Sequence, residues 1–167
     1  MDIAIAVQIF CFVFSSPDYH LSTQRKALAC KSIEHVFKES EKHNISPTLL
    51  LSVIYVESGW KKNAVSHANA CGLTQVIPKY TGNRNTGTRR LTCRQLKKPR
   101  IAITAGAKTL SYWVNKYAKG NIPTALCGYS SGYRCKGSRI SRGGMRYARK
   151  VLRFQKRIEA HAARVIE

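Results

Sequence analysis

Apolar side chains recur at spacings of three and four along most of the chain, which is the period of an amphipathic helix. The pattern holds over residues 29–40, 102–117 and 147–165, and a shorter helix is predicted from Pro123 into Tyr129. No alternation of apolar and polar residues is long enough to predict a substantial sheet. With 167 residues, of which 44% are apolar, the chain can bury one core of ordinary size. We therefore expect a single, mostly α-helical domain.

One further helix, over residues 47–58, has clear signals at both ends. Ser46 is typical of an N-cap, Pro47 of a first helical position, and Gly59 of the residue just past a C-terminus. Glu57 lies near the end of this helix, on the same face as the apolar residues three, four and seven positions before it. Burial on that face and the negative end of the helix dipole should raise its pKa, as a general acid requires. The alternative is a helix-end glutamate that points to water.

Acidic side chains are scarce in this sequence. The chain contains eight Asp and Glu residues and 29 Lys and Arg residues, which gives a net charge of +21. No acidic residue occurs over residues 58–158, so Glu57 is the last carboxylate before this long gap. If the chemistry of this protein uses an acid, Glu57 is the candidate, and it would act without a second carboxylate.

Four short motifs connect this glutamate to a known family. In chain order they are Glu57-Ser58, Gly72-Leu73-Thr74-Gln75 before Pro78, Tyr129-Ser130-Ser131-Gly132, and Tyr147-Ala148-Arg149-Lys150-Val151. Together, over residues 45–154, they resemble the family 1 lytic transglycosylases, the soluble-lytic-transglycosylase domains that cut peptidoglycan. Thr74 stands where that family has Met, and Ser130 where it has Asn. Each motif alone is weak, but the ordered set is specific, and it implies a lysozyme-like (α+β) fold with little or no sheet.

The resemblance also implies which residues form the site. Glu57 is the expected catalytic residue, and the expected substrate-binding residues are Ser58, Gly72, Gln75, Tyr129, Ser130 and Tyr147. Gln75 is expected to hydrogen-bond an N-acetyl amide, and Gly72 to keep its loop close to the glycan. The hydroxyls of Tyr129 and Tyr147 should reach the cleft and orient Glu57 or the sugar, although helical spacing alone favours core positions for both tyrosines.

A single carboxylate suits this family better than it suits most glycosidases, which flank the scissile bond with two carboxyl groups. The resemblance implies that Glu57 protonates the glycosidic oxygen and then deprotonates the C6 hydroxyl of the same sugar. That hydroxyl attacks C1 and gives a 1,6-anhydro-muramyl product, so no carboxylate has to activate water. The alternative enzyme is a lysozyme-type muramidase that recruits Glu34, Glu39 or Glu41, although these three have the pattern of a solvated helix face.

The cysteines bear on compartment and on metal binding. Cys127 and Cys135 flank one expected cleft loop, and Cys71 and Cys93 bracket much of the basic segment 83–99, which we expect to be a long loop near the cleft. Each pair would suit a disulfide in an oxidising compartment, and buried free cysteines in a reducing one are the alternative. No Cys-x-x-Cys motif occurs and the five His are scattered, so we expect neither a metal nor a cofactor.

The first residues form a separate apolar segment. Residues 3–14 are apolar almost throughout, too short to span a bilayer as a helix but suited to the core of a signal peptide that ends near Ser16. We therefore divide the chain into residues 1–16, a signal peptide or apolar segment, and residues 20–167, the transglycosylase-like domain. Asp2, with no basic residue before the apolar run, favours the alternative of a core helix. Removal of the segment would remove Cys11 and leave Cys30 unpaired.

The net charge of +21 requires a polyanion as a partner. We expect peptidoglycan glycan strands as substrate, anionic envelope polymers as further partners, and a location that is periplasmic, extracellular or virion-associated. A phage particle or a secretion apparatus could carry such a domain, which we expect to be a monomer. The competing class is a basic protein that binds nucleic acid without sequence specificity. That class leaves the ordered motifs unexplained, so we expect no specific nucleic acid.

Overall fold

The computed structural model describes residues 2–137 and 140–166 of the chain. Its helices are, in chain order, α1 (Ile3–Ser15), α2 (Thr23–Lys42), α3 (Pro47–Ser58), α4 (Cys93–Leu96), α5 (Pro99–Ser111), α6 (Ile122–Ser131) and α7 (Arg142–Ile166). Single 3-10 turns occupy Pro17–Tyr19 and Pro78–Tyr80, and α5 continues as a wider π-helix over Tyr112–Tyr117. In the described residues, β-structure is limited to isolated bridges from Cys71 to Val65 and Val76. The prediction of a mostly α-helical fold is confirmed.

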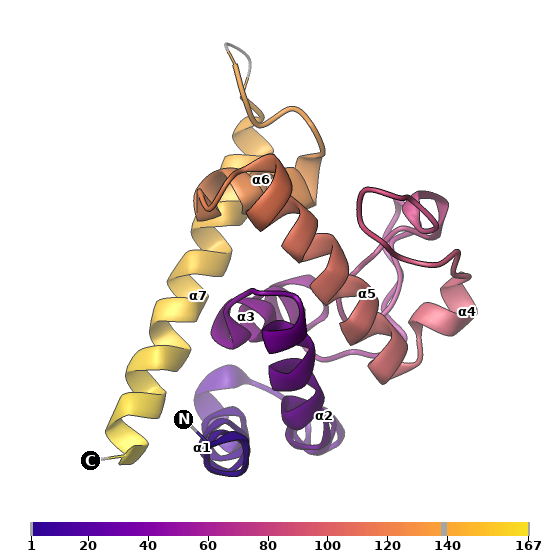
Figure 1. Ribbon diagram of the computed structural model, residues 1–167. Coiled ribbons are helices and arrows are strands. Elements are labelled where there is room, and N and C mark those ends of the chain that lie inside the picture. The colour runs from indigo at the N-terminus through magenta and orange to yellow at the C-terminus, as the bar shows by residue number, and fades with distance from the viewer. Residues whose placement is uncertain (1, 138–139, 167) are drawn as a thin grey trace.

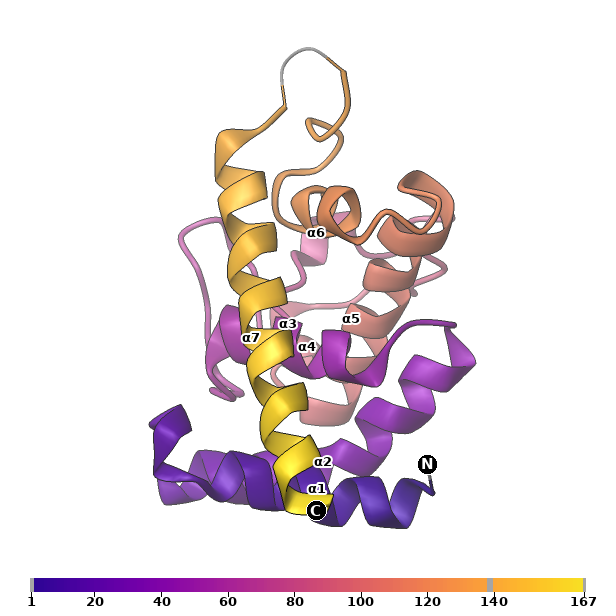
Figure 2. The same cartoon turned by 90° about the vertical axis from the view of Figure 1, so that its left-hand side faces the viewer.

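Helix α3 runs through the middle of the fold, packed against α7, α2 and α5 (Figure 1 and Figure 2). Its ends form as the sequence predicts: the Ser46 hydroxyl accepts a hydrogen bond of 3.3 Å from a backbone N–H, and Pro47 follows it. Gly59 ends the helix in the left-handed region, at φ 52°. Residues 49–54 are all buried, and burial of each large apolar side chain contributes about 1.5–3 kcal/mol to stability. This packing fixes the C-terminal turn, which carries Glu57.

Helix α7 extends along the molecule and contacts α6, α3 and α1 (Figure 2). The side that faces these helices carries the buried residues Ala148, Val151, Phe154, Ile158 and Ala162. Most of the arginines and lysines between them are exposed, so the predicted division of this helix into an apolar and a basic side is confirmed. Val165, which we expected to continue the apolar stripe, is exposed, because the last residues of the helix, 163–166, all face solvent.

Helix α1 is part of the core. Its Phe10, Val13 and Phe14 are buried, and it packs against α2 and α7. A disulfide joins Cys11 to Cys30 of α2, so Cys30 is paired in the full chain. This arrangement corresponds to the core-helix alternative, and removal of the segment as a signal peptide stays a prediction. None of the helices in the described ranges is long and apolar enough to cross a membrane.

The chain between α3 and α5 is largely irregular and lies beside α5, on the side away from α7 (Figure 1). We expected one long loop over residues 83–99, but α4 interrupts it. Thr92 and Gln95 form a capping box there: the Thr92 hydroxyl accepts from the backbone of Gln95 at 3.2 Å, and the Gln95 side chain accepts from the backbone of Thr92 at 2.8 Å. These local hydrogen bonds start a helix that the polar composition of the segment did not indicate.

All six cysteines are joined in disulfides. Two of the pairs, Cys71–Cys93 and Cys127–Cys135, are those predicted from the loops that they bracket. The first ties the irregular segment to α4, and the second closes the loop that follows α6. Both disulfides therefore hold segments that border the cleft at the C-terminal end of α3.

Candidate active site

A cleft of about 590 Å³ opens where the C-terminal end of α3 meets α6, the start of α7 and the irregular segment before α4. Five of the seven site residues predicted from the sequence line it, namely Glu57, Gln75, Tyr129, Ser130 and Tyr147. These residues come from separate parts of the chain: α3, α6 and α7 carry four of them, and Gln75 lies on the irregular segment before α4. The cleft is therefore the candidate active site.

Glu57 is the one carboxylate among the described residues that line the cleft. Burial raises its pKa from the ordinary 4.5 to about 7, while the Tyr147 hydroxyl and the charge of Lys150 act to lower it. Desolvation is the larger effect, which confirms the expected direction of the shift. Near neutral pH a large share of the Glu57 carboxyl groups is protonated and a large share is ionised. Such a group can donate a proton and later accept one, as a general acid and base must.

Two tyrosine hydroxyls lie in the buried part of the cleft, within electrostatic range of Glu57. Tyr129 donates a hydrogen bond of 2.7 Å to the backbone oxygen of Thr74, which fixes its ring. The Tyr147 hydroxyl makes no hydrogen bond of normal geometry within the described residues, yet its interaction with Glu57 affects the pKa of both groups. Burial, and then the charge of Glu57, raise the pKa of each tyrosine, so both hydroxyls stay protonated. Tyr147 is thus able to donate to Glu57 or to a bound sugar.

Replacement of Tyr147 by phenylalanine should shift the pH dependence of catalysis. The Tyr147 hydroxyl lowers the pKa of Glu57. Loss of this hydroxyl should therefore raise the pKa of Glu57 above its native value of about 7. Activity that needs protonated Glu57 should then persist to higher pH. The measurement is the midpoint of the alkaline limb when the rate of peptidoglycan clearing is plotted against pH.

The matched control for this prediction is Tyr129→Phe. The Tyr129 hydroxyl is bonded to the backbone of Thr74 and is not among the groups that set the pKa of Glu57. This control should lose activity through a less ordered ring but keep the native midpoint. An unshifted midpoint in Tyr147→Phe, or equal shifts in both variants, would contradict the positioning role of Tyr147.

Gln75 faces the cleft in a fixed orientation. Its side-chain amide nitrogen donates to the backbone oxygens of Gly72 and Ala64, at 3.0 and 3.2 Å. Because both partners are carbonyl acceptors, they determine which end of the side chain is the NH₂ group. The Oε1 atom is therefore the end that is left to bind substrate. Gln75 can accept a hydrogen bond from the N–H of an N-acetyl group, whereas it could donate to the acetyl oxygen only by giving up a bond that it already makes.

Two predicted substrate contacts find no support in the structure. The Ser58 hydroxyl donates to the backbone oxygen of Ile54 at 3.0 Å, and Ser58 lies outside the described lining of the cleft. Gly72 also lies outside that lining and packs against α4, where an added Cβ would be 1.9 Å from the backbone oxygen of Leu96. The absence of a side chain at position 72 thus allows two backbone segments to approach closely. The Gly72 backbone oxygen accepts a hydrogen bond from the Gln75 side chain, so this packing helps to position Gln75, and contact of Gly72 with the glycan stays a prediction.

Thr74 and Ser130, two of the residues that depart from the family motifs, lie in different surroundings. Thr74 is fully buried, donates its hydroxyl to the backbone oxygen of Ala102 at 2.8 Å, and occupies the space next to Gly106. Its role is to fasten the cleft segment to α5. Ser130 is exposed at the edge of the cleft, where its short side chain leaves more room than an asparagine would.

The acidic residues of α2 do not supply a second carboxylate to the cleft. Glu34 is exposed and paired with Lys38 at 2.5 Å, and Glu41 is also exposed. Glu39 was wrongly assigned to a solvated face: it is buried, 3.5 Å from His43, because α5 packs against this side of α2. None of the three lines the cleft. Within the described ranges, the site therefore contains one carboxylate, Glu57.

One wall of the cleft is aromatic, a feature that we did not predict from the sequence. Tyr112, Trp113 and Tyr133 line it, and Tyr117 packs against the last two of these rings. The hydroxyls of Tyr112 and Tyr133 are 2.8 Å apart, and the Trp113 and Tyr133 ring centroids are 5.2 Å apart. Tyr133 is 61% exposed, so this wall presents ring surface on which the apolar face of a sugar can pack. Trp113 and Tyr117 belong to the apolar pattern over residues 102–117, which predicted only a helix, and no sequence motif indicated Tyr112 or Tyr133.

Comparison with known proteins identifies a family model and several relatives that are similar to this chain. The family model described as Transglycosylase SLT domain matches residues 34–151. Membrane-bound lytic murein transglycosylase C of Haemophilus influenzae (strain PittEE) is 31% identical over 115 residues, which cover 62% of this chain and 32% of the relative. The protein of the same name from Actinobacillus pleuropneumoniae serotype 5b (strain L20) is 45% identical over 47 residues, which cover 28% and 13%.

The fold is similar to a solved structure, that of an inactive mutant of the lytic transglycosylase Slt from Pseudomonas aeruginosa. The TM-score is 0.63 at 22% identity, and the match covers 74% of this chain and 23% of that chain. This likeness confirms the expected lysozyme-like fold. This chain spans about a third or less of the length of the relatives that it matches. Because the family model matches well over half of its residues, the chain belongs to the Transglycosylase SLT domain family.

Proposed function

We propose that this protein is an enzyme, a lytic transglycosylase that cleaves the β-1,4 bond between N-acetylmuramic acid and N-acetylglucosamine in peptidoglycan. One observation carries the proposal. Glu57 is a carboxyl group with a pKa raised by burial to about 7, in a cleft that holds no other carboxylate among its described residues. Membership of the family supports the same reaction, since relatives are lytic murein transglycosylases by name.

In the first step of the proposed mechanism, protonated Glu57 donates its proton to the glycosidic oxygen. The bond between this oxygen and C1 breaks, and N-acetylglucosamine leaves with the bonding electron pair. Positive charge develops at C1, where the carbonyl oxygen of the substrate's own N-acetyl group can stabilise it. Gln75 Oε1 would hold the N–H of an N-acetyl group, and Tyr147 would donate a hydrogen bond to the Glu57 carboxylate that forms.

In the second step, the Glu57 carboxylate accepts the proton of the C6 hydroxyl, and the C6 oxygen attacks C1 of the same sugar. This closes a 1,6-anhydro ring and returns Glu57 to its protonated form. Because the nucleophile belongs to the sugar that it attacks, its effective concentration is high and no base is needed to activate water. A pKa of about 7 suits both halves of this cycle, since proton donation and proton acceptance are then similarly favourable.

The products of digestion test the reaction. Mass spectrometry of digested peptidoglycan should show muropeptides that end in 1,6-anhydro-N-acetylmuramic acid, one water lighter than the products of hydrolysis. Digestion in water labelled with heavy oxygen should leave these products unlabelled. The expectation follows from the cleft, whose described lining offers no carboxylate opposite Glu57 that could activate water.

Products with reducing ends that carry the labelled oxygen would instead identify a lysozyme-type muramidase. Glu34, Glu39 and Glu41 would then be the carboxylates to test, although α2 holds them outside the lining of the cleft. Binding to DNA that weakens with salt, together with an absence of glycan cleavage, would favour the basic nucleic-acid-binding protein.

We further propose that the protein acts in the bacterial envelope, in the periplasm or outside the cell. Its three disulfides are stable in such oxidising compartments, and the relatives named above are called membrane-bound. Peptidoglycan strands would be the substrate there, and anionic envelope polymers further partners of the basic surface. Association with a phage particle or a secretion apparatus, and a monomeric state, stay predictions.

A further inference from the structure

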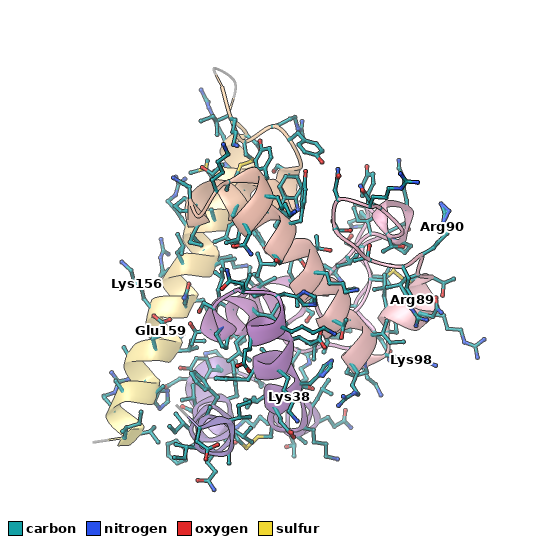
Figure 3. All side chains as sticks on the ribbon, in the orientation of Figure 1. Lys38, Arg89, Arg90, Lys98, Lys156 and Glu159 are labelled. Carbon is teal, nitrogen blue, oxygen red and sulfur yellow. A yellow bond between two sulfur atoms is a disulfide. The ribbon has the colours of Figure 1, made fainter. Side chains whose placement is uncertain are left out.

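A second cavity lies between α2, α5 and the loop that precedes α4. Its volume is about 320 Å³, and its polar lining is formed by His35, Thr88, Arg89, Arg100, Thr104 and Lys108. It shares no lining residue with the active-site cleft. In Figure 3, Arg89 extends from the fold on the side of α4, far from the basic side of α7 that carries Lys156. The cavity is therefore a separate polar feature of the domain.

Three cations line this cavity and are not neutralised by the protein. Neither of the salt bridges among the described residues involves Arg89, Arg100 or Lys108. One acidic residue, Glu34, is within electrostatic range of Arg100, but its carboxylate is bonded to Lys38 at 2.5 Å. Lys108 donates a hydrogen bond of 2.9 Å to a backbone oxygen of the loop, which holds its charge at the cavity. The cavity thus keeps positive charge that an external anion can neutralise.

The other polar groups that line the cavity carry no negative charge, and Glu39, which acts electrostatically on His35, lies outside the lining, 3.5 Å from His43. His35 Nε2 lies 3.2 Å from the backbone oxygen of Arg100 and 3.1 Å from the Thr104 hydroxyl. Burial lowers the pKa of His35, so its ring is uncharged near neutral pH. The hydroxyls of Thr88 and Thr104 are neutral and can donate hydrogen bonds. Arginine and lysine charges combined with hydroxyl donors are the chemistry by which proteins bind phosphate groups.

We propose that this cavity binds a phosphate group of a flexible phosphodiester polymer of the cell envelope. Arg89, Arg100 and Lys108 would surround one phosphate, and Arg90 and Lys98, which extend nearby on the same side (Figure 3), would meet the next phosphates along the polymer. A flexible chain can bend one unit into a recess, whereas the phosphates of a stiff duplex cannot enter it without distortion of the duplex. Attachment there would hold the domain at the wall while the separate cleft, under the function proposed above, cuts glycan.

Calorimetric titration of the full chain with short poly(glycerol phosphate) tests the site. The double variant Arg89→Gln/Arg100→Gln should bind this polymer about a hundredfold more weakly, since each charge-assisted hydrogen bond contributes roughly tenfold. Its binding should also depend less on salt concentration. Because no glycan is present in this titration, its outcome is independent of whether Glu57 catalyses cleavage. Cleavage of glycan strands that carry no phosphodiester polymer should be unchanged in the variant.

The matched control is Arg153→Gln/Lys156→Gln, which removes the same charge from exposed residues of α7. This control should bind the polymer within about threefold of the native protein, and both double variants should keep the native circular dichroism spectrum. Equally weak polymer binding by the two double variants would overturn the proposed site, because binding would then depend on net charge alone. Binding to phosphatidylglycerol vesicles but not to the polymer would overturn the polymer assignment, as would tighter binding to duplex DNA.

Discussion

Replacement of Glu57 by glutamine should lower the rate of glycan cleavage by about 10³-fold or more. The amide keeps the shape of the side chain but has no proton of suitable acidity to donate and cannot accept one from the C6 hydroxyl. No other carboxylate in the described lining of the cleft can take over either task. The measurement is the clearing of purified peptidoglycan, together with the amount of soluble muropeptide released.

The same substitution should leave the fold intact and can even stabilise it. The pKa of Glu57 is about 7 in the folded chain, and its ordinary value is 4.5. At a pH between these two values, Glu57 therefore binds more protons in the folded chain than in the unfolded chain. The free energy of unfolding therefore falls as pH rises from about 4.5 through 7, by roughly 3 kcal/mol when complete. Glu57→Gln removes this penalty, so at about pH 8 its melting temperature should equal or exceed the native one. A loss of activity that accompanies a lower melting temperature would point to misfolding instead.

Glu34→Gln is the matched control, because it makes the same chemical change on an exposed side chain of α2. It should retain native activity, and so should Glu41→Gln. Near-native clearing by Glu57→Gln would reject the enzymatic proposal. A loss in Glu34→Gln or Glu41→Gln as large as that in Glu57→Gln would indicate a second carboxylate and favour the hydrolase.

The place of Glu57 was predictable because the signals that set it are local. Ser46, Pro47 and Gly59 fix the ends of α3 through hydrogen bonds and backbone conformations that involve only neighbouring residues. The apolar residues one and two turns before Glu57 then determine which side of the helix it occupies. Burial of that side raises the pKa of the carboxyl group, as expected from the sequence. A short segment of chain thus encodes both the position and the acidity of the proposed catalytic group.

Features that arise where distant segments pack could not be predicted in this way. The aromatic wall needs Tyr112 and Tyr133, which lie on either side of α6 and meet only in the folded chain. Glu39 has the spacing of an exposed residue, and its burial depends on α5. The contact of Gly72 with the backbone of Leu96 depends on where α4 forms, and α4 itself was not predicted. In each case the deciding partner is remote in sequence.

Replacement of Gly72 by alanine should lower the free energy of unfolding by about 2–5 kcal/mol. The added Cβ would lie 1.9 Å from the backbone oxygen of Leu96, at a residue whose φ of 77° already disfavours a side chain. The two segments cannot easily separate, because Cys71 is joined to Cys93 in the same turn of α4 as Leu96. The strain should also displace Gln75, which donates to the Gly72 backbone oxygen, and so raise the KM for glycan.

The control that isolates this close approach is Gly120→Ala. Gly120 has a similar φ of 89°, but an added Cβ there would meet no atom within 4 Å. Gly120→Ala should lower the free energy of unfolding by about 1–2 kcal/mol, through backbone strain alone, and leave the KM for glycan unchanged. Thermal melting, monitored by circular dichroism, should therefore show that Gly72→Ala loses about 1–3 kcal/mol more of the free energy of unfolding than Gly120→Ala does. The additional loss comes from overpacking against the backbone of α4. Equal melting temperatures would mean that α4 yields to the added methyl group. Gly72 would then be required for its backbone conformation alone, and the orientation of Gln75 would not depend on the contact with Leu96.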